Sequence, residues 1–152
     1  MHLLVLHGPN LRSLGTRQPE LYGAHTLSQI NERLQEEAAA LGARLIAHQS
    51  NHEGQLIDWL EEYRQNMDGC ILNAAGYTHT SVALLDAVLA FGKPVVEVHL
   101  TEPREREEFR HTCLVGEVCE ARFAGKGVES YVEGLRWLVD HLSPSLESEE
   151  GS

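Results

Sequence analysis

The sequence lacks a long hydrophobic run, because no apolar stretch approaches the ~18 residues of a membrane-spanning helix. Its first residues have no basic segment of the kind that opens a signal peptide, so residues 3–6 are predicted to form the first strand of a cytoplasmic protein. The three cysteines, Cys70, Cys113 and Cys119, lack Cys-x-x-Cys spacing. They are predicted to be reduced structural thiols, since redox and zinc sites commonly use paired cysteines.

Positive charge is also scarce, because 12 lysine and arginine residues face 23 aspartate and glutamate residues and the formal net charge is −11. This balance argues against nucleic acid or an anionic membrane as a partner. Part of the negative charge lies in residues 143–152, which are predicted to be an acidic, disordered tail after a single domain at residues 1–142. An anionic substrate is still possible, because screening confines the field of distant charges to about 8 Å at physiological salt.

Several motifs of known chemistry are absent. The sequence has no Gly-x-Ser-x-Gly elbow of an α/β-hydrolase and no Gly-Lys-Ser/Thr phosphate loop. No nucleotide-binding fingerprint follows the first apolar run, and cysteine pairs with metal-ligand spacing are missing. The sequence therefore predicts no metal site and no nucleotide cofactor.

The most distinctive segment that is present is a polar loop at residues 10–22, directly after the first predicted strand. Its course is interrupted by Gly15, Pro19 and Gly23, which exclude a long helix or strand there. A loop of this length in a compact domain is usually either functional or disordered. The asparagine, arginine and tyrosine side chains that it carries favour a functional loop.

Short apolar runs alternate with amphipathic segments along the rest of the chain. Strands are predicted at residues 3–6, 44–49, 69–73 and 95–100, with a weaker one near 118–123. Helices are predicted at residues 26–41 with a Thr26/Gln29 capping box, from a Ser50/Glu53 capping box through Met67, from Thr80 or Ser81 to Phe91, and at 128–142. This alternation predicts an α/β fold, a flavodoxin-like, doubly wound, five-stranded parallel sheet with helices on both faces.

Ligands of such folds bind beyond the carboxyl ends of the strands. The polar residues expected to converge there are Asn10, Arg17, Tyr22, Asn73, His79 and His99. Each has a structural alternative: Tyr22 as an aromatic anchor of the loop, Asn73 as a cap of the following turn, and His99 as a hydrogen-bonded structural histidine. His99 shares one face of its predicted strand with Glu97, and charged residues buried in apolar strands are uncommon without partners.

Several sequence blocks, taken together, carry a resemblance to a known family. They are Leu6-His7-Gly8-Pro9-Asn10-Leu11, Leu14-Gly15-x-Arg17-Gln18-Pro19, Tyr22-Gly23, Gln49-Ser50-Asn51-x-Glu53-Gly54, Leu72-Asn73-Ala74-x-Gly76-x-Thr78-His79-Thr80-Ser81, Asp86, Val96-Glu97-Val98-His99-Leu100 and Arg106-Glu107-x-Phe109-Arg110. Residues 2 to about 142 resemble type II 3-dehydroquinate dehydratase, an enzyme of the shikimate and quinate pathways.

The resemblance implies reversible anti elimination of water from 3-dehydroquinate to 3-dehydroshikimate through an enolate, without a metal or an organic cofactor. It makes Tyr22 the base that removes the C2 proton and His99 the acid that protonates the departing C1 hydroxyl. It implies that Arg17 stabilises the phenolate, that Glu97 orients His99, and that Asn10 holds a water against the enolate oxygen.

The resemblance also implies the substrate contacts. The backbone N–H groups of Leu100 and Thr101, together with Asn73, would hold the substrate carboxylate. His79 and Arg110 would contact the ring hydroxyls.

Asp86 is implied to reach a neighbouring subunit's site in a homo-oligomer, a dodecamer built as a tetramer of trimers. The sequence departs from the family at Thr112-Cys113, where a serine and an aromatic residue are common, and at Ser130, where glycine is common. These departures are expected to affect local packing and subunit contacts.

The unrelated type I enzyme forms a Schiff base on a lysine, but this chain has only Lys93 and Lys126, and Lys93 precedes a predicted strand on the edge opposite the polar residues. Two other functions stay open from the residues alone. The same polar groups could belong to a non-catalytic module that binds a small polyhydroxy acid or a phosphate. They could also belong to an assembly scaffold, on which they contact only partner proteins.

Overall fold

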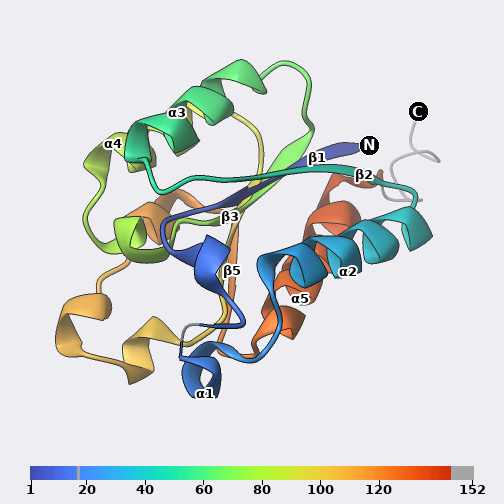
Figure 1. Ribbon diagram of the computed structural model, residues 1–152. Coiled ribbons are helices and arrows are strands. Elements are labelled where there is room, and N and C mark those ends of the chain that lie inside the picture. The colour runs from blue at the N-terminus through green and yellow to red at the C-terminus, as the bar shows by residue number, and fades with distance from the viewer. Residues whose placement is uncertain (17, 145–152) are drawn as a thin grey trace.

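Five short strands form one sheet in the computed structural model, which describes residues 1–16 and 18–144 (Figure 1). The strands are β1 (His2–His7), β2 (Arg44–Gln49), β3 (Gly69–Asn73), β4 (Val95–His99) and β5 (Ala121–Ala124). The helices among the described residues are α1 (Pro19–Tyr22), α2 (Leu27–Ala40), α3 (Glu53–Glu62), α4 (Val82–Phe91) and α5 (Val128–Leu142). Arg17 and residues 145–152, most of the predicted acidic tail, lie outside the described residues.

The strand order is β2-β1-β3-β4-β5, and each neighbouring pair is parallel. This order is flavodoxin-like, so the predicted doubly wound α/β fold is confirmed. The chain reverses its direction of winding between β1 and β3, which places their carboxyl ends side by side without a covering helix. The fold therefore offers a ligand crevice beyond these two strands.

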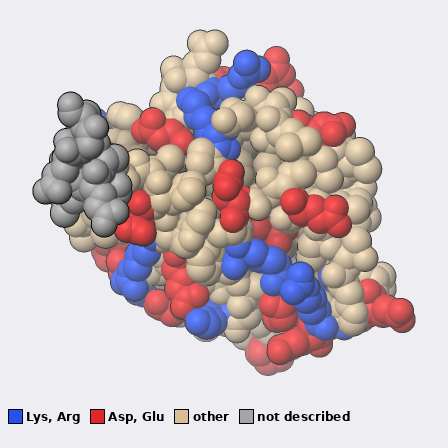
Figure 2. Space-filling view, turned by 180° about the vertical axis from the view of Figure 1, so that it is seen from behind, with Lys and Arg blue, Asp and Glu red and all other residues tan. Residues whose placement is uncertain are grey.

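Helices α2 and α5 cover one face of the sheet, and α3 and α4 cover the other (Figure 1). Strand β1 supplies both cores, because Leu3 and Val5 point to one face while Leu4 and Leu6 point to the other. A strand buried on both faces reads as a continuous apolar run, which is why its position was predictable. On the outside, acidic and basic side chains are interspersed over the face seen in Figure 2.

The ends of the helices test the predicted capping residues. At α2 the capping box is confirmed, since the Gln29 backbone N–H donates to Thr26 Oγ1 and the Thr26 N–H donates to Gln29 Oε1. At α4 the capping residue is Ser81, whose Oγ accepts the Leu84 N–H. The predicted Ser50/Glu53 box is wrong: α3 begins at Glu53, and Ser50 Oγ accepts the His52 N–H in the turn before the helix.

Two other predicted boundaries are corrected. Helix α3 ends at Glu62, so Met67 lies beyond it, buried in the α3 and α4 core from a loop. Strand β5 begins at Ala121 and not near residue 118, because Val118 is the last residue of a 3-10 turn at residues 115–118. In both places tertiary packing buries apolar residues without regular structure, which hydrophobic pattern alone does not reveal.

Gly8 fixes the approach of the polar loop to the carboxyl end of β3. Its N–H donates to the Asn73 carbonyl at 2.7 Å. A Cβ atom at this position would lie 2.6 Å from the Ala74 carbonyl oxygen, a backbone atom that cannot move aside easily. The glycine therefore permits the loop that follows to lie against β3, where the candidate site forms.

Candidate active site

A cavity of about 240 Å³ opens beyond the carboxyl ends of β1, β3 and β4. Its lining is Pro9, Asn10, Leu11, Tyr22, Asn73, Ala75, Gly76, His79, His99, Leu100, Thr101, Pro103, Arg106 and Arg110. The ionised groups in this lining are the guanidinium groups of Arg106 and Arg110, with no acidic side chain among them. The cavity thus suits a small anion despite the negative net charge of the chain.

Tyr22 reaches the cavity from the end of the short helix α1, and its side chain is half-buried. Arg106 Nη1 donates to the Tyr22 hydroxyl oxygen at 3.1 Å, and the guanidinium carbon lies 5.5 Å from the centre of the phenol ring. This contact places a positive charge at the phenol oxygen. Sequence reasoning gave that role to Arg17, which lies outside the described residues.

His99 and Glu97 project from the same face of β4, as the alternation of the strand predicts, and both are buried. His99 Nε2 lies 3.4 Å from Glu97 Oε2, close enough for an ion pair when the imidazole is protonated. This nitrogen has no hydrogen-bond partner among the described residues. His99 lines the cavity, whereas Glu97 lies behind it. The structure therefore places a carboxylate behind an imidazole that lines the cavity.

The Glu97 carboxylate is held by several groups. Thr78 Oγ1 donates to Oε2 at 2.7 Å, and Arg122 Nε donates to Oε1 at 3.0 Å. The two terminal nitrogens of Arg122 also donate to the two carboxylate oxygens of Glu102, at 3.1 and 2.8 Å. Burial by itself would raise the pKa of Glu97, but His99, Thr78 and Arg122 outweigh it and lower the pKa. Glu97 is therefore a carboxylate at neutral pH.

Gly116 closes the remaining side of this carboxylate. A Cβ atom there would lie 2.6 Å from Glu97 Oε1 and 2.7 Å from Oε2. Any other residue would thus push the carboxylate away from its present position. Three residues were not predicted as site residues, Gly116, Thr78 and Arg122. Each lies against the Glu97 carboxylate, and none of them lines the cavity.

Asn73 combines the two roles that the sequence left open. Its Oδ1 accepts the Ala75 N–H at 3.1 Å and so caps the turn after β3, and the same side chain lines the cavity. Ala75 has a φ of 51°, in the left-handed region that a residue with a Cβ rarely adopts. Such strain is concentrated at functional sites.

His79 lies across the cavity. Its Nδ1 donates to the Thr112 carbonyl at 2.8 Å, which leaves Nε2 as an acceptor on the neutral ring. Burial lowers the pKa of His79, partly offset by the Thr112 hydrogen bond. Arg110 is oriented by Glu107, whose Oε2 accepts from Arg110 Nε at 2.7 Å. The cavity therefore offers a hydrogen-bond acceptor beside a fixed cation.

Asn10 adopts a left-handed conformation with a φ of 69°, which asparagine tolerates better than most residues. Its N–H donates to Asn51 Oδ1 at 3.0 Å, and Gln49 Nε2 donates to the same oxygen at 3.1 Å. Gln49, the last residue of β2, and Asn51, just after it, thus support the polar loop and do not line the cavity themselves.

Most residues predicted for the site line this one cavity: Asn10, Tyr22, Asn73, His79, His99, Leu100, Thr101 and Arg110. Glu97 lies behind His99, and Asp86 is exposed on α4, away from this cavity. Arg106 was missed as a site residue, although it stands in the quoted Arg106-Glu107-x-Phe109-Arg110 block. Its contact with Tyr22 joins residues 84 positions apart, which no local pattern reveals.

A second, wider hollow of about 880 Å³ lies between the polar loop and α2, lined by residues that include Arg12, Leu14 and Glu36. It brings together no titratable pair comparable to His99 and Glu97 and lies beside a helix, not at the strand ends. No cluster that could hold a metal ion occurs among residues 1–16 and 18–144. Within the same residues, no helix has the length and apolar character needed to cross a membrane.

Comparison with known proteins identifies the family of this chain. The family model described as dehydroquinase class II matches residues 1–139. The chain belongs to the class II dehydroquinase family. It is 49% identical over 143 residues to a 3-dehydroquinate dehydratase of Dinoroseobacter shibae, covering 94% of this chain and 95% of the relative. A 3-dehydroquinate dehydratase of a Nostoc species is also 49% identical, over 93% of this chain and 97% of its own.

Solved structures agree with this class II dehydroquinase assignment. The crystal structure of type II dehydroquinase from Butyrivibrio crossotus superposes with a TM-score of 0.89 at 35% identity, covering 91% of this chain and 97% of the other. That of Propionibacterium acnes gives a TM-score of 0.88 at 33% identity, covering 91% and 96%. The predicted family resemblance is therefore confirmed.

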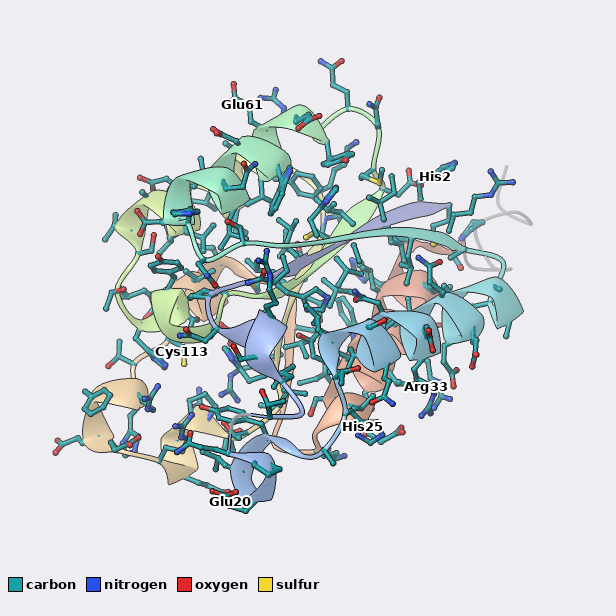
Figure 3. The ribbon with its side chains drawn as sticks, viewed as in Figure 1. His2, Glu20, His25, Arg33, Glu61 and Cys113 are labelled. Atoms are coloured by element: carbon teal, nitrogen blue, oxygen red, sulfur yellow. The ribbon has the colours of Figure 1, made fainter. Side chains whose placement is uncertain are left out.

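One of the two predicted departures from the family pattern, Thr112-Cys113, lies beside a residue that lines the cavity. The Thr112 carbonyl accepts from His79, and Cys113 Sγ lies 4.0 Å from His79 Nδ1 (Figure 3 labels Cys113). Ser130 is buried at the start of α5, where its Oγ accepts the Lys126 N–H at 2.9 Å. The first departure thus bears on a cavity residue as well as on local packing, while the second supports a helix end.

Neither lysine of this class II dehydroquinase lines the cavity. Lys93 lies two residues before β4, and its Nζ donates to the Met67 carbonyl. Lys126 forms an ion pair with Glu133 at the surface. Both lysines therefore lie outside the lining of the cavity.

Proposed function

We propose that this chain catalyses reversible dehydration of 3-dehydroquinate to 3-dehydroshikimate, as a hydro-lyase that uses side chains alone. One observation carries the proposal most directly. The Tyr22 phenol, with Arg106 at its oxygen, and the His99 imidazole, with Glu97 behind it, line one small cavity in a class II dehydroquinase. A base and an acid that line the same cavity are what an elimination of water requires.

Tyr22 acts as the base in this reaction. Its phenolate oxygen removes the C2 proton, and the electron pair of the C–H bond passes to the C3 carbonyl to give an enolate. An unperturbed phenol is mostly protonated at neutral pH. A guanidinium group at hydrogen-bond distance stabilises the phenolate, and Arg106 is so placed at 3.1 Å. The predicted contribution of Arg17 adds to this positive charge.

His99 acts as the acid in the second half of the reaction. As the enolate collapses, a double bond forms between C1 and C2, the C1–O bond breaks, and His99 donates the proton that makes the leaving group water. A well-placed general acid accelerates such a step by roughly 100- to 10,000-fold. The anionic Glu97, 3.4 Å from the ring, stabilises the imidazolium before it gives up its proton.

Substrate binding follows from the remaining lining residues. Asn73 and the backbone N–H groups of Leu100 and Thr101 hold the substrate carboxylate, while His79 and Arg110 contact ring hydroxyls. Asn10 holds a water against the enolate oxygen, as an oxyanion-stabilising donor. All six residues line the cavity that Tyr22 and His99 share, which supports these roles.

The chain acts in a homo-oligomer, a dodecamer assembled from trimers, in which α4 packs on a neighbouring subunit and Asp86 reaches that subunit's cavity. Asp86 is exposed on α4 and does not line the cavity of its own chain. Val82, one turn before Asp86 on α4, and Leu89, one turn after it, are 60% and 58% exposed. This apolar surface around an acidic residue supports a subunit contact. The cytoplasmic location stays a prediction.

Absorbance spectroscopy tests the activity directly, because the product is a conjugated enone and the substrate is not. 3-Dehydroquinate is added to the purified protein after treatment with a chelator and, separately, with borohydride. A rise in enone absorbance that survives both treatments is expected. Tyr22→Phe should bind the substrate with little change and lose turnover by several orders of magnitude. No rise from a folded wild-type protein would overturn the proposed function, and unchanged turnover in Tyr22→Phe would overturn the role of the base.

A further inference from the structure

A chain of hydrogen bonds lies behind the cavity and joins four elements of the fold, β3, α5, β1 and α2. Asn73 Nδ2 donates to Tyr131 Oη at 2.9 Å, and that oxygen lies 2.9 Å from His7 Nδ1. His7 Nε2 lies 2.8 Å from Asn31 Oδ1. His7 and Tyr131 have no exposed surface and do not line the cavity, so the proposed reaction gives them no role. Buried polar groups of this kind are costly unless every partner is supplied.

The direction of the hydrogen bonds follows from the acceptor at one end. With Asn31 Oδ1 as acceptor, His7 Nε2 carries the ring proton, and the neutral ring leaves Nδ1 as an acceptor. Tyr131 then donates its O–H to Nδ1 and accepts the N–H of Asn73 on the same oxygen. Burial lowers the pKa of His7 to about 4, against a smaller opposing effect of Asn31, so the ring is neutral at physiological pH.

Asn73 is consequently fixed at both ends of its carboxamide. Nδ2 is held by Tyr131, and Oδ1 accepts the Ala75 N–H at 3.1 Å. A carboxamide turned by 180° would set its amino group against the Ala75 N–H, donor against donor, and would leave Tyr131 without the N–H that it accepts. In the observed orientation, one N–H of Nδ2 has no partner within the described part of the chain, and Asn73 lines the cavity.

We infer that Tyr131 and His7 are positioning residues for substrate binding, because their hydroxyl and imidazole hold the Asn73 carboxamide with an N–H directed to the substrate carboxylate. This inference rests on the proposed function for the identity of the ligand. Positioning of Asn73 would explain why a costly polar network is kept in the interior of the protein. Neither residue touches the substrate, so their effect reaches it only through Asn73.

Tyr131→Phe removes only the hydroxyl that joins the two sides of the chain. We expect KM for 3-dehydroquinate to rise by about 3- to 10-fold, the value of one net hydrogen bond, while kcat changes by less than about twofold. Tyr63→Phe is the matched control, because the Tyr63 hydroxyl also bonds a histidine, His48 Nε2 at 2.8 Å, but away from the cavity. Tyr63→Phe is expected to leave both constants unchanged.

A pair of variants at His7 tests the same inference without touching Tyr131. His7→Asn can present an amide oxygen near the position of Nδ1 and is expected to keep KM close to wild type. His7→Leu offers no acceptor to the Tyr131 hydroxyl and is expected to raise KM as Tyr131→Phe does. Circular dichroism and gel filtration show which variants fold. If Tyr131→Phe does not fold, this pair decides the question.

A double-mutant cycle separates positioning from general damage. In an Asn73→Ala background, Tyr131→Phe should add no further rise in KM, because the group that it positions is gone. An unchanged KM in folded Tyr131→Phe, or the same rise with and without Asn73, would overturn the inference. If wild type shows no turnover, the proposed function fails. The same cycle, measured as calorimetric binding of 3-dehydroquinate, then still tests the coupling, and absence of binding by wild type overturns the inference as well.

Discussion

The buried His7 makes the stability of this protein depend on pH in a defined direction. In the native state burial lowers its pKa from the ordinary value of 6.5 to about 4. Between these two values the unfolded chain carries a proton on the imidazole that the native protein does not carry. Stability therefore rises with pH through this window and falls as the pH is lowered from neutrality towards 4.

The size of the effect follows from the two pKa values. At pH 5 the unfolded imidazole is almost fully protonated and the native one almost fully neutral, so the linkage amounts to about 2 kcal/mol relative to neutral pH. His7→Asn removes the titrating ring and keeps an acceptor for Tyr131. The variant should therefore lose about 2 kcal/mol less stability than wild type between pH 7.5 and pH 5, whatever its stability at pH 7.5.

Urea denaturation at both pH values, at one protomer concentration, measures the difference. The other histidines and the carboxyl groups titrate in both proteins, so the comparison isolates His7. An equal loss of stability in wild type and His7→Asn would refute the buried, neutral state of this imidazole. It would also remove the reason for assigning the direction of the hydrogen bonds to Asn73.

Three further predictions concern residues that hold the cavity together. Gly116→Ala places a methyl group 2.6 Å from Glu97 Oε1, so kcat should fall by about tenfold or more while the circular dichroism spectrum is unchanged. A wild-type kcat together with a wild-type pH–rate profile would contradict this prediction. Arg106→Leu removes the guanidinium at the Tyr22 oxygen and should lower kcat, measured by steady-state kinetics, by about 10- to 100-fold. Arg104→Leu, on the same segment, is the control and should have little effect on kcat. Gly8→Ala places a Cβ against the Ala74 carbonyl and should lower the free energy of unfolding, measured by urea denaturation, by about 1–3 kcal/mol. An unchanged denaturation midpoint would mean that β1 and β3 can separate at this point.

Part of the fold was predictable because its signals are local. The strands at residues 44–49 and 69–73 and the helix at 128–142 have the observed bounds, since each carries its own periodic pattern. The Thr26/Gln29 box was predictable for the same reason. Ser50 and Glu53 have the same spacing but form no box, because the chain turns at Ser50 and begins its helix two residues later than the motif requires.

The sequence by itself determined the winding of the sheet and the meeting of the polar residues after its strands in one cavity, because apolar alternation sets the faces and parallel strands bring their carboxyl ends to one edge. It did not determine how those members are held. The contacts of Arg106 with Tyr22 and of Tyr131 with Asn73 join residues 84 and 58 positions apart. Only the tertiary structure decided them, because such hydrogen bonds depend on how loops and helices pack across the sheet.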